Sequence, residues 1–186
     1  YAGVNGSGKH NNWSIGTDTG ENLLDPGDTP NENLQFLLVL SCIMKAVDVH
    51  ADLLRQSASC VGNEHRLGGQ EAPPAIISIC LGDQLESVVD QIVSNADSIQ
   101  LLASGKLDSG VSTVPVLSRD ATDRNRTTPF AFTGNKFEFR MVGSSDSIAD
   151  ANTTLNAIVA EAMCEAADVL EKADDFNTAC FKLIHD

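Results

Sequence analysis

The chain has 186 residues, 42% of them hydrophobic, which is enough apolar material for one folded core and excludes a disordered polymer. Its 26 acidic and 12 basic residues give a formal net charge of −14, which excludes nucleic acid as the main partner because phosphate binding needs a basic surface. No signal peptide is visible and no apolar run reaches the length of a membrane span, so we expect a cytoplasmic protein.

The cysteines indicate a reducing compartment. They number five, which is odd, and no two of them have CxxC spacing. Cys42, Cys80 and Cys164 lie in apolar runs, where a thiol packs as a small hydrophobic group. We therefore expect free thiols.

The first half of the sequence predicts a strand, a turn-rich segment, a long helix and a second strand. Residues 9–16 have a strand pattern that leads into a loop, and residues 17–30 are rich in turn formers. A helix is predicted over 31–57, with Asn31 as its N-cap and apolar residues near helical spacing. A loop is predicted over 58–74, followed by a short buried strand at 75–80 (AIISIC).

The second half predicts four helices and a β-ribbon. An amphipathic helix is expected over 83–94, a polar irregular segment over 96–122 with a short helix near 97–104, and a β-ribbon over 129–142. Two further helices are expected over 147–173 and 174–185. The sequence starts directly on a motif and ends within an apolar pattern, so we expect a fragment of a longer polypeptide.

The pentapeptide KFEFR at the end of the ribbon carries the strongest chemical signal. In a strand its two phenylalanines share one face, while Lys136, Glu138 and Arg140 share the other. A solvated edge strand fits this pattern equally well. The preceding Arg124 and Arg126 favour a functional interpretation, because guanidinium groups near a carboxylate suit an anionic substrate and a divalent metal.

Residues 3–9 fit the GxxxxGK pattern of a phosphate-binding P-loop, except that His10 follows where a P-loop has Ser or Thr. A P-loop also opens a helix, whereas the residues after Lys9 are polar and strand-like. A P-loop ATPase is therefore the least favoured alternative.

Four segments, taken in order, resemble the catalytic domain of glutamine synthetase, most closely its long type III form. They are NGSGKHNNWS at 5–14, Arg66 with the Glu-Ala-Pro step at 71–73, Arg-Asn-Arg at 124–126, and Glu-x-Arg at 138–140. The resemblance covers nearly the whole chain. It implies an α+β fold in which an antiparallel curved sheet forms the floor of the active site and long helices back it. It also implies ATP-dependent joining of ammonia to the γ-carboxylate of glutamate.

The resemblance implies that His10 and Glu138 bind one Mg²⁺ or Mn²⁺ ion, which bridges the phosphates of the co-substrate ATP. Taken alone, a single histidine is more often structural than a metal ligand, and Glu138 supplies the matching carboxylate. The remaining ligands of the metal centre are implied to lie before Tyr1.

The resemblance also implies four catalytic residues. Glu71 shields the reactive intermediate from water and helps to take a proton from ammonium, and Arg66 touches the substrate carboxylate. Arg126 stabilises charge on the transferring phosphoryl group, and Arg140 clamps phosphate or the substrate carboxylate. For the Arg66 and Glu71 pair, a surface turn with a salt bridge is the alternative.

The implied binding residues divide between the two substrates. Those for glutamate are Asn5, Gly6, Arg66 and Arg140, and those for ATP are Ser14, Arg126 and Lys136. The parent is implied to be a large ring-shaped homo-oligomer with no membrane or nucleic-acid partner. We expect this fragment alone to be poorly soluble or inactive.

The sequence departs from the short form of the family in several places. Asn12 stands where that form has a second His, and Ala131 stands where it has a phosphate-binding Arg. The spacing from Arg66 to Glu71 is one residue short, and the resemblance implies that residues 75–122 form a subfamily insertion in a partial catalytic domain that spans 1–186. Two alternatives remain open: a related ligase that adds another amine, which the flap and substrate residues do not exclude, and a non-catalytic homologue.

Overall fold

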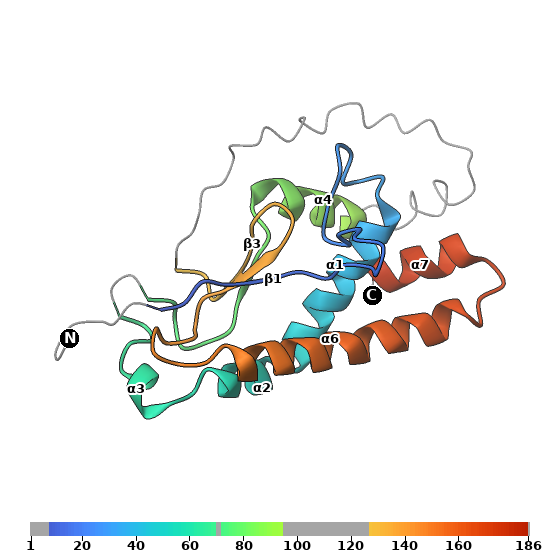
Figure 1. The fold of residues 1–186 in the computed structure, drawn as a ribbon. Coiled ribbons are helices and arrows are strands. Elements are labelled where there is room, and N and C mark those ends of the chain that lie inside the picture. The colour runs from blue at the N-terminus through green and yellow to red at the C-terminus, as the bar shows by residue number, and fades with distance from the viewer. Residues whose placement is uncertain (1–7, 70–71, 95–126, 186) are drawn as a thin grey trace.

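The computed structural model of the chain describes residues 8–69, 72–94 and 127–185. Within these ranges it contains one four-stranded sheet and six helices (Figure 1). The strands are β1 (Asn11–Trp13), β2 (Ile79–Cys80), β3 (Phe130–Phe132) and β4 (Phe137–Phe139). The helices are α1 (Leu34–Val49), α2 (Ala51–Ser57), α3 (Val61–Glu64), α4 (Asp83–Ser94), α6 (Ala149–Leu170) and α7 (Phe176–His185). None of these helices is both long enough and apolar enough to cross a membrane.

The sheet confirms the α+β prediction and corrects the expected strand arrangement. The strand order is β1-β4-β3-β2, in which β4 pairs antiparallel with β1 and β3, whereas β2 pairs parallel with β3. A parallel pair needs a crossover connection, and the segment between β2 and β3 contains α4. The prediction of a curved, wholly antiparallel sheet is therefore wrong: the sheet is mixed, and its strands of two or three residues are too short to curl strongly.

The helix predictions hold for three helices and need correction for the first. Helices α4, α6 and α7 lie within their predicted ranges. The predicted helix over 31–57 is instead two helices, α1 and α2, separated at His50 (φ −114°, ψ 29°). Its N-cap is Asn33 rather than Asn31, because the Asn33 Oδ1 atom accepts a 3.0 Å hydrogen bond from the Phe36 N–H. The helix expected near 97–104 lies outside the described residues.

Two further segments differ in detail from the sequence predictions. The loop expected over 58–74 contains the short helix α3, and the strand expected over 75–80 is reduced to β2. The ribbon expected over 129–142 forms the β3–β4 hairpin, whose turn includes Gly134 at φ +91°. The thiols of all five cysteines are free.

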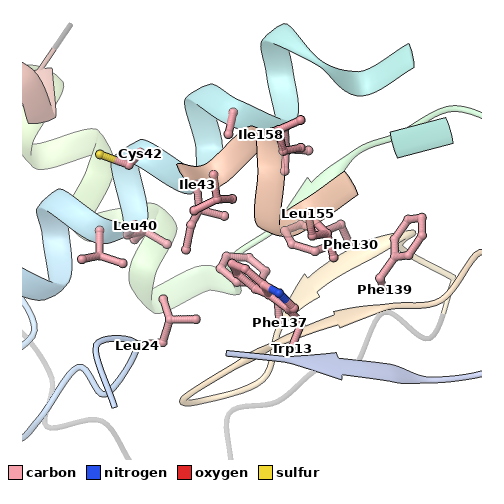
Figure 2. Close-up of a cluster of buried hydrophobic side chains, with 14 of the residues drawn as sticks. Trp13, Leu24, Leu40, Cys42, Ile43, Phe130, Phe137, Phe139, Leu155 and Ile158 are labelled. Atoms are coloured by element: carbon pink, nitrogen blue, oxygen red, sulfur yellow. The ribbon is translucent and has the colours of Figure 1, made fainter. Parts of the chain in front are cut away.

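The hydrophobic core lies between one face of the sheet and helices α1 and α6 (Figure 2). Phe137 and Phe139 are fully buried on this face, as the alternating pattern predicts. The ring of Phe130 stacks on that of Phe137, with centroids 4.5 Å apart, and meets the edge of Phe139 at 6.3 Å. Leu155 of α6 and Ile43 of α1 are also fully buried in this cluster.

Strand β1 is attached to α6 by two amide hydrogen bonds. The Nδ2 atom of Asn11 donates to the Oδ1 atom of Asn152 at 2.8 Å, and the indole N–H of Trp13 donates to the Oδ1 atom of Asn156 at 2.9 Å. Asn11 and Trp13 are two residues apart and share one face of the strand. Residues 152 and 156 are four residues apart and share one face of the helix, so each strand residue meets one helix residue. These bonds fix the position of β1 over α6.

We expect Phe137→Ala to lower the free energy of unfolding by about 3–5 kcal/mol, because it removes a fully buried ring from the Phe130 stack. Phe176→Ala is the matched control, since the Phe176 side chain is 57% exposed. Urea denaturation of the polypeptide that contains the chain, followed by circular dichroism, measures the difference. Equal losses for the two variants would contradict the core described above.

Candidate active site on the polar face of the sheet

The face of the sheet opposite the aromatic core carries the polar residues predicted from the sequence. The strand register places Glu138 of β4 directly between Asn12 of β1 and Ala131 of β3. His10 lies two residues before Asn12, and Arg140 lies two residues after Glu138, so both belong to the same face. The predicted metal ligands therefore come from β4 and from the residue just before β1, the antiparallel neighbour of β4.

An ion pair with Arg140 orients the Glu138 carboxylate. The Nε and Nη2 atoms of Arg140 both lie close to Glu138 Oε2, at 2.8 Å and 2.7 Å. The Arg140 Nη1 atom also donates to the carbonyl of Thr128 at 3.3 Å, and the Arg140 residue is only 4% exposed. Since Arg140 engages Oε2, the other carboxylate oxygen, Oε1, faces His10 Nδ1 at 3.5 Å.

The electrostatic surroundings keep Glu138 ionised. Burial raises the pKa of Glu138, but the hydrogen bond and charge of Arg140, together with His10, outweigh burial and hold the pKa below its ordinary value. The Glu138 side chain is 17% exposed and that of His10 is 62% exposed. The site therefore presents a fixed carboxylate beside an accessible imidazole.

The donor pair of His10 and Glu138 fits two neighbouring ligands of a divalent ion. Adjacent ligands of an octahedral Mg²⁺ lie about 3 Å apart, given metal–oxygen distances near 2.1 Å. The 3.5 Å separation of Nδ1 and Oε1 is close to this value. Within the described ranges, no cluster of three or more His, Cys, Asp or Glu residues forms that could hold a metal. The described residues thus supply two donors, and Mg²⁺ commonly keeps several water or phosphate ligands besides.

Ser14 and Lys136, the predicted ATP-binding residues, lie at one end of the β1–β4 pair. The Ser14 hydroxyl donates to Asn22 Oδ1 at 2.8 Å, and Asn22 Nδ2 donates to the carbonyl of Asn135 at 2.8 Å. Asn22 therefore connects Ser14 to the residue beside Lys136. From the sequence, Asn22 belongs only to a turn-rich segment, because its role depends on contacts that no local pattern encodes.

Arg66 is buried and binds backbone carbonyls. It is 3% exposed, its Nε atom donates to Asn63 Oδ1 at 2.9 Å, and its Nη2 atom donates to the carbonyl of Met141 at 2.8 Å. Burial lowers the pKa of Arg66, and Asp146 partly opposes this, but a guanidinium remains charged at neutral pH. The predicted contact of Arg66 with the substrate carboxylate stays a prediction.

Asn63 is a buried residue that the sequence analysis missed. It is 0% exposed, and its Nδ2 atom donates to the carbonyls of Ala58 and Met141, each at 2.7 Å. Its Oδ1 atom accepts from Arg66, so both ends of the amide are bonded. Asn63 lies in α3, where the sequence predicted only a loop, so its buried bonding role was not predicted.

The P-loop alternative is wrong. Lys9 is followed by strand β1 rather than by the helix that a P-loop opens. The Lys9 ammonium donates to the carbonyls of Ser144 and Asp146, both at 2.5 Å, so it is committed to the protein's own backbone.

Four predicted site residues lie outside the described residues. They are Asn5, Gly6, Glu71 and Arg126. Their roles stay predictions. A groove of about 820 Å³ lies away from the polar face, among α1, β2, α4, α6 and α7, and the predicted site residues do not line it.

The chain matches no protein-family model. It is 60% identical over 163 residues to the type-3 glutamine synthetase of Dictyostelium discoideum, covering 88% of this chain and 22% of that protein. It is 49% identical over 174 residues to a glutamine synthetase of Bacteroides fragilis, covering 92% of this chain and 24% of that protein. For a glutamine synthetase of Butyrivibrio fibrisolvens the identity is 55% over 139 residues, covering 74% of this chain and 19% of that protein.

The chain thus spans less than a quarter of the length of these relatives, but they match most of its own length. Identity near or above one half over such long stretches reflects common descent. The chain belongs to the glutamine synthetase family.

Proposed function

We propose that the polypeptide containing this chain joins ammonia to the γ-carboxylate of glutamate, using ATP and passing through γ-glutamyl phosphate, with glutamine, ADP and phosphate as products. One observation carries the proposal: His10 lies 3.5 Å from a carboxylate of Glu138 that Arg140 holds in place. This pair lies in a chain that is 49–60% identical to three glutamine synthetases over 74–92% of its length.

His10 and Glu138 would hold the divalent ion, Mg²⁺ or Mn²⁺, in this proposal. When bound, the ion neutralises negative charge on the phosphates of ATP. The protein's own contribution is to fix the two donors in advance. The charge-assisted bonds from Arg140 leave the Glu138 carboxylate little freedom to turn, and the antiparallel pairing of β1 with β4 sets the distance to His10.

Cations near the ATP phosphates would supply the electrostatic part of phosphoryl transfer. This reaction needs positioning and charge more than covalent help from the protein. Ser14, Lys136 and Arg126 are assigned here to the nucleotide, and Asn22 supports the first two by bonding Ser14 and the backbone of Asn135. Arg126 would act on the transferring phosphoryl group.

Asn5, Gly6, Arg66 and Arg140 are assigned to glutamate, and Glu71 is assigned to the flap that closes over it. A flap is chemically necessary because water competes with ammonia for the reactive acyl phosphate. We further propose that the full protein forms a large homo-oligomer, as the family resemblance implies, and that it is cytoplasmic.

We expect Glu138→Gln to lower activity by at least the roughly 10- to 100-fold that is typical for loss of a group supporting a metal ligand, because the amide replaces the charged ligand itself. The assay measures phosphate release by the full-length polypeptide with ATP, Mn²⁺, glutamate and ammonium. Glu165→Gln is the control, since Glu165 pairs with Lys45 on exposed helix surface.

Wild-type activity that requires both glutamate and ammonium, and is lost in Glu138→Gln alone, supports the proposal. Activity with another amine in place of ammonium would assign a related ligase. A folded wild type without activity would leave a non-catalytic homologue as the better account.

We expect Arg140→Lys to raise the Mn²⁺ concentration for half-maximal activity by about tenfold. Lysine keeps the positive charge but loses the two-point contact with Glu138 Oε2. Arg55→Lys is a matched control, because Arg55 makes a similar two-point contact with Glu64, at 2.7 Å and 3.2 Å, away from the site. Equal Mn²⁺ requirements in the two variants would show that Arg140 does not orient the carboxylate.

A further inference from the structure

Residues 140–146, which connect β4 to α6, are held by two cations. The Nη2 atom of Arg66 lies within hydrogen-bond distance of the carbonyls of Arg140, Met141 and Val142, at 3.5, 2.8 and 3.4 Å. The Lys9 ammonium donates to the carbonyls of Gly143, Ser144 and Asp146, at 3.5, 2.5 and 2.5 Å. Arg66 thus binds the carbonyls in the first part of the connection, and Lys9 binds those in the second part.

Lys9 is attached to this connection through its main chain as well. Its backbone N–H donates to the carbonyl of Val142 at 2.8 Å. An ammonium group has three N–H donors and no acceptor, so the three carbonyls of residues 143, 144 and 146 match its full donor capacity. This arrangement indicates a structural cation rather than one reserved for a ligand.

Glycine makes the close approach of these segments possible. Gly8 and Gly143 form an isolated antiparallel bridge just before β1 and just after β4. A Cβ atom on Gly8 would lie 2.7–2.9 Å from the guanidinium of Arg66, which is shorter than carbon–nitrogen contacts allow. Three consecutive residues therefore have distinct tasks: Gly8 makes room for Arg66, Lys9 binds the connection, and His10 faces Glu138.

We propose that Lys9 is a positioning residue for the metal site. Its bonds to residues 142–146 fix the start of β1 against the end of β4, and this sets the distance between His10 and Glu138. The inference rests on the proposed function, because it takes His10 and Glu138 as metal ligands. It assigns Lys9 no contact with substrate or metal.

The variant that tests this inference is Lys9→Met, which keeps most of the side-chain length but removes all three donors. Mn²⁺ binding to the full-length polypeptide without substrates is measured by electron paramagnetic resonance of the free ion. We expect about tenfold weaker Mn²⁺ binding. This is the lower end of the effect of mutating residues that support a metal ligand without touching the metal. Lys45→Met, which breaks an exposed ion pair with Glu165, should bind Mn²⁺ like the wild type.

Three results would overturn the inference. Unchanged Mn²⁺ affinity with a lower melting temperature would make Lys9 a purely structural residue. Unchanged Mn²⁺ affinity with a raised KM for ATP would assign Lys9 to the nucleotide. A wild type that binds no Mn²⁺ would overturn the proposed metal site and this inference with it.

The inference and the proposed reaction can fail separately. A wild type that binds Mn²⁺ but forms no glutamine, with weaker binding in Lys9→Met, rejects the reaction and supports the role of Lys9. If Lys9→Met does not fold, Lys9→Gln replaces it, because the amide keeps two donors. We then expect a smaller loss of Mn²⁺ affinity, and no loss in a folded Lys9→Gln protein would overturn the inference.

Discussion

The alternation of side chains along β4 is the constraint on which the site depends. Phe137 and Phe139 are fully buried against α1 and α6, so the residue between them must lie on the opposite face. A register slip of one residue would put Glu138 into the core and the two rings outside it. Such a slip is strongly disfavoured, because it would bury a charge and expose two aromatic side chains. The position of the candidate metal ligand is therefore set by hydrophobic packing on the far side of the sheet.

Three cations near the ends of β1 and β4 organise the protein itself. Arg140 bonds Glu138 and the carbonyl of Thr128, Arg66 bonds Asn63 and the carbonyl of Met141, and Lys9 bonds the connection after β4. Buried or half-buried charges need such partners, since an uncompensated charge away from water is costly. In a chain with only twelve basic residues, three are thus bonded to groups of the protein itself.

Local sequence patterns predicted the local structure, but they did not predict contacts between residues far apart in the sequence. The KFEFR alternation and the helix over 83–94 were predictable because each depends on residues near in sequence. The parallel pairing of β2 with β3 was not, because it depends on a long crossover. The hydrogen bonds from Arg66 to backbone carbonyls were not predictable either. Every residue has a backbone carbonyl, so the residue type does not show which carbonyl will be bound. His10 and Glu138 were matched through the family resemblance, and the strand register brings them together at 3.5 Å.

Two of the departures expected from the family resemblance, Asn12 and Ala131, fall on either side of Glu138. The register pairs Glu138 with Asn12 on β1 and with Ala131 on β3. The Asn12 amide donates to the carbonyl of His10 at 3.3 Å, and Ala131 offers only a methyl group, so neither side chain supplies a cation to the carboxylate. Glu138 is instead held from its own strand by Arg140 and is approached diagonally from β1 by His10. A carboxylate supported in this way depends on the alignment of β1 with β4 more than on its direct cross-strand neighbours, which is why the contacts at the ends of these two strands matter for the site.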